Sequence, residues 1–159
     1  MKKTLVLSLG SNLGNRYANI KQSIALLSER FNTSITEAQY YETPPWGELN
    51  QSKFINTAVS LATELSAQQC FEIAQSIEKE MGRLKVKKWG PRNIDIDIIF
   101  YGEDTIKTEE LEIPHPRLQD RAFVLAPLLD LFPDKKHPET STLLSSYLSQ
   151  LNNDAVVFS

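Results

Sequence analysis

Residues 94–101 have the sequence Ile-Asp-Ile-Asp-Ile-Ile-Phe-Tyr and run into a turn at 102–104. This density of β-branched and aromatic residues is typical of a strand. Because side chains alternate between the two faces of a strand, the three alternate isoleucines share one face while Asp95 and Asp97 project from the other. The stretch therefore predicts a sheet that carries two neighbouring carboxylates.

The sequence before this strand contains a regular series of further elements. Alternating apolar residues indicate strands, apolar residues at three- and four-residue spacing indicate helices, and glycine, proline and capping residues mark their ends. Ser66 is a favourable helix N-cap and Gly82 a favourable helix terminator. The expected elements are strands at 4–9, 34–42 and 54–65, a helix from about 17 to 30, and a second helix from 67 to 81.

The resulting order is strand, helix, strand, strand, helix, strand. Two crossover helices on one face of an antiparallel sheet give an α+β protein with a ferredoxin-like βαββαβ core. The remaining sequence predicts C-terminal elaborations of this core, a hairpin over 106–113 and helices over 122–131 and 143–151.

The composition is that of an ordinary globular protein. The 159 residues are 41% hydrophobic and 23% charged, which fits a single domain over 1–159. A net charge of −3 argues against broad nucleic-acid binding, and no apolar run is long enough to span a membrane. Cys70 is the only cysteine, so no intramolecular disulfide is possible, and a cytoplasmic monomer is the expectation.

The acidic pair is preceded by a strongly basic segment. Residues 83–92 carry five cations and no acid, with Arg92 just ahead of the carboxylates. Carboxylate oxygens suit Mg²⁺, which completes its coordination with water and substrate phosphates, and neighbouring cations neutralise a polyphosphate. Each feature alone has an ordinary alternative, a polar strand face for Asp95 and Asp97 and a solvated loop for the basic segment. Together they favour a magnesium-dependent, ATP-using transferase.

Other candidate residues carry weaker signals. The sequence from Gly10 to Gly14 lacks the Gly-Lys-Ser/Thr of a phosphate-binding P-loop, so Gly10 is interpreted as part of a tight strand-to-helix turn, with Ser11 or Asn15 as cap. His115 lies between prolines and becomes a functional candidate only if its loop folds over the carboxylates.

Two further residues have structural interpretations. His137 lacks a functional context and is expected at the surface, and Cys70 is expected to pack inertly in the core.

Several short motifs are spread over the chain. They are Gly10-Ser11-Asn12-Leu13, Glu42-Thr43-Pro44-Pro45, Phe54-Ile55-Asn56, Gly82-Arg83, Trp89-Gly90-Pro91-Arg92, Ile94 to Asp97, Pro114-His115, and Arg121 with Phe123. Together they resemble the 6-hydroxymethyl-7,8-dihydropterin pyrophosphokinase family of folate synthesis. The resemblance covers residues 4 to about 130, and its most specific part is Trp-Gly-Pro-Arg joined to the paired aspartates.

The resemblance implies transfer of diphosphate from ATP to the pterin hydroxymethyl group, with release of AMP and use of two magnesium ions. Asp95 and Asp97 match the metal ligands, and Arg83 and Arg92 match arginines that engage the phosphates. The positions that match the ATP site are Gln75, Glu78, Lys88, Trp89, Arg92, Ile98, His115 and Arg121.

For the pterin, the resemblance implies that Asn56 hydrogen-bonds the ring and that Phe54 and Phe123 stack on its two faces, which suits a flat heterocycle rich in donors and acceptors. Thr43, Pro44 and Trp46 complete this set, with backbone contacts, and the loops at 43–53 and 83–92 are expected to close over the substrates.

The sequence departs from the family pattern at three places. Lys88 stands where an arginine is frequent, in a segment about one residue shorter than in some relatives, so the individual roles of Lys85, Lys87 and Lys88 are not carried over. Phe54 stands where some members have a tyrosine, which keeps the stacking face but loses a hydroxyl. Pro116 follows His115 where another aromatic residue can occur, which leaves the local nucleotide contacts open.

Two rival functions remain open at this level. Another two-metal phosphoryl or nucleotidyl transferase accounts for the acids and cations but gives no role to Asn56, Phe54 and Phe123. A non-catalytic binding module of the same fold predicts no pterin-dependent chemistry.

Overall fold

The computed structural model describes residues 2–43, 53–82, 93–151 and 156–157. Its centre is a sheet in the order β5-β1-β4-β3-β8, with β2 also paired to β4. The long central strands are β1 (Lys3–Ser11), β4 (Phe54–Thr63) and β5 (Asp95–Tyr101). The short strands are β2 (Thr36–Glu37), β3 (Tyr41–Thr43) and β8 (Val156–Val157). All pairings are antiparallel, so the expected ferredoxin-like strand arrangement is confirmed.

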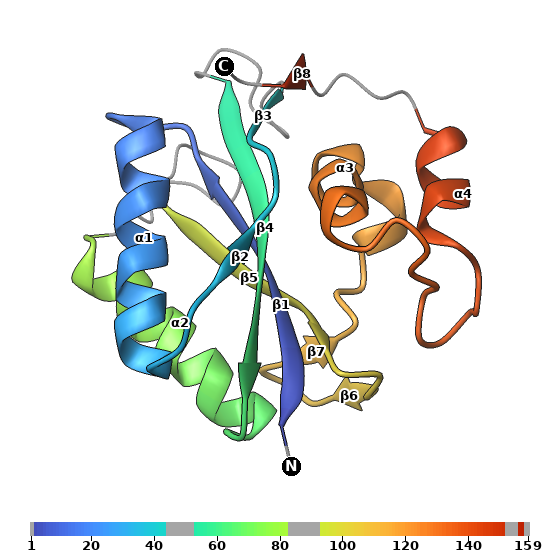
Figure 1. The fold of residues 1–159 in the computed structure, drawn as a ribbon, viewed down its shortest axis with the longest axis horizontal. Coiled ribbons are helices and arrows are strands. Elements are labelled where there is room, and N and C mark those ends of the chain that lie inside the picture. Colours follow the sequence, from blue (N-terminus) through green and yellow to red (C-terminus); the bar gives the residue numbers. More distant parts are fainter. Residues whose placement is uncertain (1, 44–52, 83–92, 152–155, 158–159) are drawn as a thin grey trace.

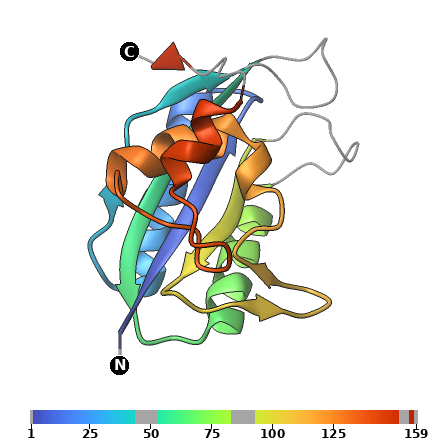
Figure 2. The ribbon, with the colours of Figure 1, turned by 90° about the vertical axis from the view of Figure 1, so that its right-hand side faces the viewer.

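Helices cover both faces of this sheet. The first face carries α1 (Arg16–Phe31) and α2 (Ala67–Glu80), and the opposite face carries α3 (Ala122–Leu131) and α4 (Leu144–Ser149), as Figure 1 shows. Figure 2 shows α3 and α4 in front of the sheet. None of the helices in the described part of the chain has the length and hydropathy needed to cross a membrane.

Two apolar clusters separate the sheet from its helices. On the α1/α2 side, Leu5, Leu7 and Leu9 of β1 are fully buried, whereas Val6 lies in the cluster beneath α3 and α4. This division follows from strand alternation. The face of the sheet that carries Asp95 and Asp97 is therefore partly a second core.

A bulge in β5 shapes this second core. Leu7 pairs with Ile98 but Val6 pairs with Phe100, so Ile99 is an extra residue in the ladder. Ile99 and Phe100 consequently both contribute to the α3/α4 cluster. Asp95 and Asp97 precede the bulge and keep the simple alternation with Ile96 and Ile98.

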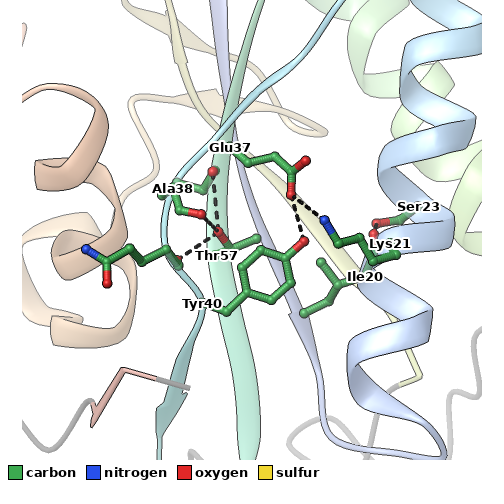
Figure 3. A network of polar contacts seen from close by, with 9 residues as sticks. Ile20, Lys21, Ser23, Glu37, Ala38, Tyr40 and Thr57 are labelled. Carbon is green, nitrogen blue, oxygen red and sulfur yellow. Dashed lines mark hydrogen bonds and ion pairs between the residues drawn. The ribbon is translucent and has the colours of Figure 1, made fainter. Parts of the chain in front are cut away.

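The expected strand at 34–42 is two short strands instead. Between them the chain is held by Thr57, whose Oγ1 donates to the carbonyl of Gln39 at 3.0 Å. On the other side Tyr40 donates to Glu37 Oε1 at 2.8 Å, and Lys21 approaches the same oxygen at 3.3 Å (Figure 3). Burial, with Glu37 close by, raises the pKa of Tyr40 and keeps its hydroxyl protonated as a donor. These side-chain bonds replace part of the strand ladder.

The chain after β5 follows the predicted elaborations. β6 (Ile106–Lys107) and β7 (Glu112–Ile113) form a separate hairpin, and a 3-10 turn, η1 (Leu118–Asp120), precedes α3. His137, expected at the surface, is only 5% exposed, because its Nδ1 accepts the backbone N–H of Glu139 at 3.1 Å and its ring packs edge-on against Tyr147. That expectation was wrong.

Of the two cap candidates for the first helix, Asn15 is the cap and Ser11 is not, and the expected cap at Ser66 is present. Asn15 accepts the N–H of Ala18 at the start of α1, and Ser66 forms a reciprocal capping box with Gln69 at the start of α2. Gly82 follows α2 with a φ of 75°, a conformation that glycine adopts without strain.

We expect Ser66→Ala to lower the free energy of unfolding by about 1 kcal/mol, because it leaves the N–H of Gln69 without its cap. Chemical denaturation monitored by circular dichroism measures this loss. Gln68→Ala, an exposed change in the same turn, is the matched control and should change the stability by less than about 0.5 kcal/mol. Equal effects of the two changes would contradict the capping role.

Candidate active site

Four neighbouring strands present the candidate residues on the α3/α4 face of the sheet. Asp95 pairs with Gly10, Gly10 pairs with Asn56, and Asn56 pairs with Tyr41, so these four residues form one row across the sheet. Neighbouring strands are about 4.8 Å apart, which places the backbones of Asp95 and Asn56 about 10 Å from each other. The expected metal and pterin residues thus face the same space.

Asp95 and Asp97 lie side by side on this face, as the sequence indicated. Their strand neighbours Ile96 and Ile98 point into the α1/α2 core, and Asp97 pairs across the sheet with Ser8. Both aspartates are half-buried. Two hard oxygen donors on adjacent positions fit a Mg²⁺ ion that takes its remaining ligands from water and phosphate. No group of three or more His, Cys, Asp or Glu side chains in the described ranges is arranged as a metal site.

The edge of β5 next to this pair is closed by α2. Glu78 is buried and its Oε2 accepts the backbone N–H of Ile96 at 2.8 Å. One turn further, Asn93 Nδ2 donates to the carbonyl of Met81 at 2.6 Å. These two bonds hold the backbone that carries both aspartates against the end of α2.

The expected nucleotide residues of α2 and β5 gather at the same edge. Gln75 is exposed three residues before Glu78, on the same side of the helix. The side chain of Ile98 lies in the core, so only its backbone is available to a ligand. By strand alternation its N–H points to the same edge as that of Ile96. Ile98 can therefore contribute backbone hydrogen bonds at this edge.

Arg121 brings a positive charge to the carboxylates from the start of α3. Burial lowers the pKa of its guanidinium, while Asp97 and, more weakly, Asp95 raise it. Arginine remains protonated under such conditions. Its guanidinium carbon lies 5.7 Å from the centre of the Phe123 ring, a cation–π geometry. The guanidinium therefore links the acidic pair to the expected stacking residue.

His115 is held neutral beside this charged group. Burial, followed by the charge of Arg121, lowers the pKa of its imidazole to about 4, against the opposing effects of Glu112 and Asp95. Its Nδ1 accepts the backbone N–H of Arg117 at 3.2 Å, which leaves the ring proton on Nε2. At neutral pH the ring can donate a hydrogen bond to a ligand without carrying charge.

The expected pterin residues lie at the other end of the row. Asn56 is only 4% exposed, and its Nδ2 donates to Thr43 Oγ1 at 2.8 Å. Phe54, two residues earlier on the same face of β4, and Phe123 at the start of α3 are both half-buried. The hydroxyl of Tyr41 donates to Asp130 Oδ2 at 2.9 Å and so fixes α3 against β3.

An arginine joins the ends of the two strands that carry Thr43 and Phe54. Arg16 Nη1 lies 2.8 Å from Glu42 Oε2 and 2.9 Å from the carbonyl of Lys53. The contacts of Arg16, Glu78 and Asn93 carry no signal in the sequence, because nothing local predicts which distant groups these side chains meet.

Gly10 does not have the role expected from the sequence. It lies inside β1, and the turn before α1 is made instead by Gly14, with a φ of 71°. The remaining site predictions, namely Pro44, Trp46, Arg83, Lys88, Trp89 and Arg92, fall outside the described residues.

Together the fold and the site define a class, an α+β protein with a ferredoxin-like sheet that carries an acidic pair on the same face as an amide and two aromatic rings. Residues 6–133 match the family model described as 7,8-dihydro-6-hydroxymethylpterin-pyrophosphokinase. The chain belongs to this family, whose members transfer diphosphate from ATP to the hydroxymethyl group of the pterin, releasing AMP, in folate biosynthesis.

Relatives across bacteria and fungi support this assignment. The 2-amino-4-hydroxy-6-hydroxymethyldihydropteridine pyrophosphokinase of Bacillus subtilis is 39% identical over 89% of this chain and 85% of its own length. The Aquifex aeolicus protein of the same name is 41% identical over 85% and 84%. The folic acid synthesis protein fol1 of Pneumocystis carinii is 42% identical over 94% of this chain, which spans 20% of that protein.

Solved structures agree on the fold. A crystal structure of HPPK-DHPS in complex with substrates matches 94% of this chain with a TM-score of 0.73 at 17% identity. Wild-type Plasmodium falciparum HPPK-DHPS with STZ-DHP matches the same share with a TM-score of 0.73, also at 17% identity. This chain spans 44% and 43% of those chains.

We expect the His115 imidazole to titrate at about pH 4, since burial and Arg121 oppose its protonation. An unfolded histidine has a pKa near 6.5, so the unfolded chain binds more protons between these values. The stability contributed by the neutral ring is complete above about pH 6.5 and is lost as the pH falls toward 4. Imidazole NMR signals followed against pH, assigned with His115→Gln, measure this, and a midpoint near 6.5 would contradict it.

Proposed function

We propose that this chain binds ATP along the outer edge of β5 and the pterin between Asn56, Phe54 and Phe123, and that Asp95 and Asp97 hold two magnesium ions between them. The row that places Asp95 and Asn56 on opposite sides of Gly10 carries this proposal. It is the arrangement needed to bring a phosphate and a hydroxymethyl group to one point.

The described residues support distinct parts of the binding of ATP. Gln75 and the backbone of Ile98 line the edge for the nucleotide base, with Glu78 fixing that edge through its bond to Ile96. His115 offers a neutral N–H donor and Arg121 a charge for the phosphates. When bound, magnesium supplies charge neutralisation at the phosphate oxygens and orients them.

Arg83, Lys88, Trp89 and Arg92 are proposed as the further nucleotide and phosphate residues on the strength of the sequence motif alone. Pro44 and Trp46 are proposed on the same basis for the pterin.

The reaction is a displacement at the β-phosphorus. The hydroxymethyl oxygen forms a bond to this phosphorus while the bond to the bridging α,β-oxygen breaks. AMP leaves with the bonding electron pair, and the hydroxyl proton passes to solvent. No covalent enzyme intermediate is required. The side chains act by holding the two substrates in line and by stabilising the negative charge on the transferred group, the principal sources of catalysis in such sites.

The pterin end of the site offers both stacking and hydrogen bonding. Thr43 accepts from Asn56 and can donate its own hydroxyl proton, while the amide of Asn56 retains an acceptor oxygen and a second N–H. The flat pterin ring, with its adjacent donors and acceptors, matches these hydrogen-bonding groups and the two phenylalanine rings. A general nucleotidyl transferase does not require this combination.

We expect the wild-type protein to release AMP from ATP only when the hydroxymethyl pterin and Mg²⁺ are both present. Asp95→Ala should lower kcat by at least about 100-fold, because it removes one of two metal-binding carboxylates. Chromatography of the nucleotide products measures this, with Glu109→Ala, an exposed acid elsewhere, as the control. Formation of ADP alone, or an unchanged rate in Asp95→Ala, would refute the proposed function.

We expect Asn56→Ala to raise the KM for the pterin by about tenfold or more while changing the KM for ATP by less than about twofold, since a lost buried hydrogen-bonding group costs about 1–3 kcal/mol. Steady-state kinetics with each substrate varied in turn measure this. A rise in both KM values together would count against Asn56 as a pterin residue.

A further inference from the structure

Gly10 occupies a position in β1 where glycine is not required by the backbone. It lies in the regular ladder between β4 and β5. Its φ is not positive, unlike that of Gly14, Gly82 and Gly102 among the described residues. Glycine weakens a strand interior, by roughly 0.5–1 kcal/mol relative to alanine in regular structure. Its presence here therefore calls for a steric reason.

The reason is the close approach of Asn56 from the neighbouring strand. A Cβ atom on Gly10 would lie 2.6 Å from Asn56 Oδ1, much closer than a carbon–oxygen contact allows, and 3.6 Å from a ring carbon of Phe54. The oxygen is not the end of a freely moving side chain, because Nδ2 of the same amide is bonded to Thr43 Oγ1 at 2.8 Å and the residue is 4% exposed. The amide thus lies across the bare backbone of Gly10.

The same bare backbone separates the two halves of the site. Gly10 pairs on one side with Asp95 and on the other with Asn56, and the side chains of both project on the face where a Gly10 side chain would also project. A methyl group at position 10 would therefore act first on the Asn56 amide, since a Cβ there would lie 2.6 Å from Asn56 Oδ1.

We propose that Gly10 is a positioning residue for pterin recognition: its missing side chain lets the Asn56 amide lie flat on β1, held by Thr43, with the orientation that the pterin requires. The inference rests on the proposed function for the identity of the ligand. Gly10 touches no reacting atom itself and acts through Asn56.

The test compares Gly10→Ala, Asn56→Ala and the double variant in steady-state kinetics, with Thr4→Ala, an exposed change in the same strand, as control. Gly10→Ala should raise the KM for the pterin by about tenfold, the effect of losing a hydrogen bond to a fixed group, with the KM for ATP within about twofold of wild type. The double variant should be no worse than Asn56→Ala, because the displaced amide is gone.

Three results would overturn the proposal: an unchanged pterin KM in Gly10→Ala, parallel rises in the KM for both substrates, or additive effects in the double variant. If Gly10→Ala does not fold, the double variant must fold, since it removes the clashing oxygen. Failure of both to fold would also overturn it.

A substrate-free measurement separates this inference from the proposed function. The side-chain amide NMR signals of Asn56, assigned with Asn56→Ala, should shift in Gly10→Ala and remain unchanged in Thr4→Ala. If the wild-type protein releases no AMP but the amide signals shift as expected, the proposed function fails and the steric role of Gly10 stands. If AMP is released and the amide signals do not shift, the role of Gly10 is refuted alone.

Discussion

The antiparallel pairing of β1 with a strand on each side is the constraint on which the site depends. Its register sets Asp95, Gly10 and Asn56 in one row and Asp97 beside Ser8 in the next. A shift of one residue in either pairing would turn the aspartates or the amide toward the α1/α2 core. The apolar residues that alternate with them, such as Ile96 of β5 and Ile55 of β4, oppose such a shift, because they would have to leave a buried cluster.

The bulge at Ile99 makes this register compatible with a second core. Before the bulge, β5 presents polar side chains to the α3/α4 face, and after it Ile99 and Phe100 both bury against that face. The helices α3 and α4 can then pack closely at one end of the sheet while the other end remains polar. Arg121 and Phe123, at the start of α3, lie at the boundary between the apolar end and the polar end of this face.

The charges at this boundary are only partly offset. Arg121 offsets part of the negative charge of Asp95 and Asp97, and His115 is kept uncharged by burial and by that same arginine. In the proposed ATP site, a neutral donor beside this cation can bind phosphate oxygens without adding charge. The carboxyl of Glu78 is used structurally in the same region, since it closes the edge of β5.

Sequence reasoning located the elements and the acidic pair because those depend on local properties. The two-residue period around Asp95 and Asp97, the cap at Ser66 and the terminator at Gly82 are set by neighbours in the chain, and all are found in the structure. The pterin and nucleotide roles came from resemblance, since single side chains such as Asn56 or His115 carry no local signal of function. The break between β2 and β3 was missed because it depends on Thr57, which is distant in sequence.

By itself, therefore, the sequence determined the order of elements and the face of β5 that bears the two carboxylates, because hydrophobic periodicity dictates both. Only the tertiary structure decided the surroundings of those carboxylates. Strand register places Gly10 and Asn56 in the row of Asp95, and the packing of α3 brings Arg121 close. Burial keeps His115 neutral. The tertiary structure also shows that Gly10 is not a turn residue but leaves room for the amide of Asn56. This close approach of Asn56 to Gly10 exists only because their strands are paired.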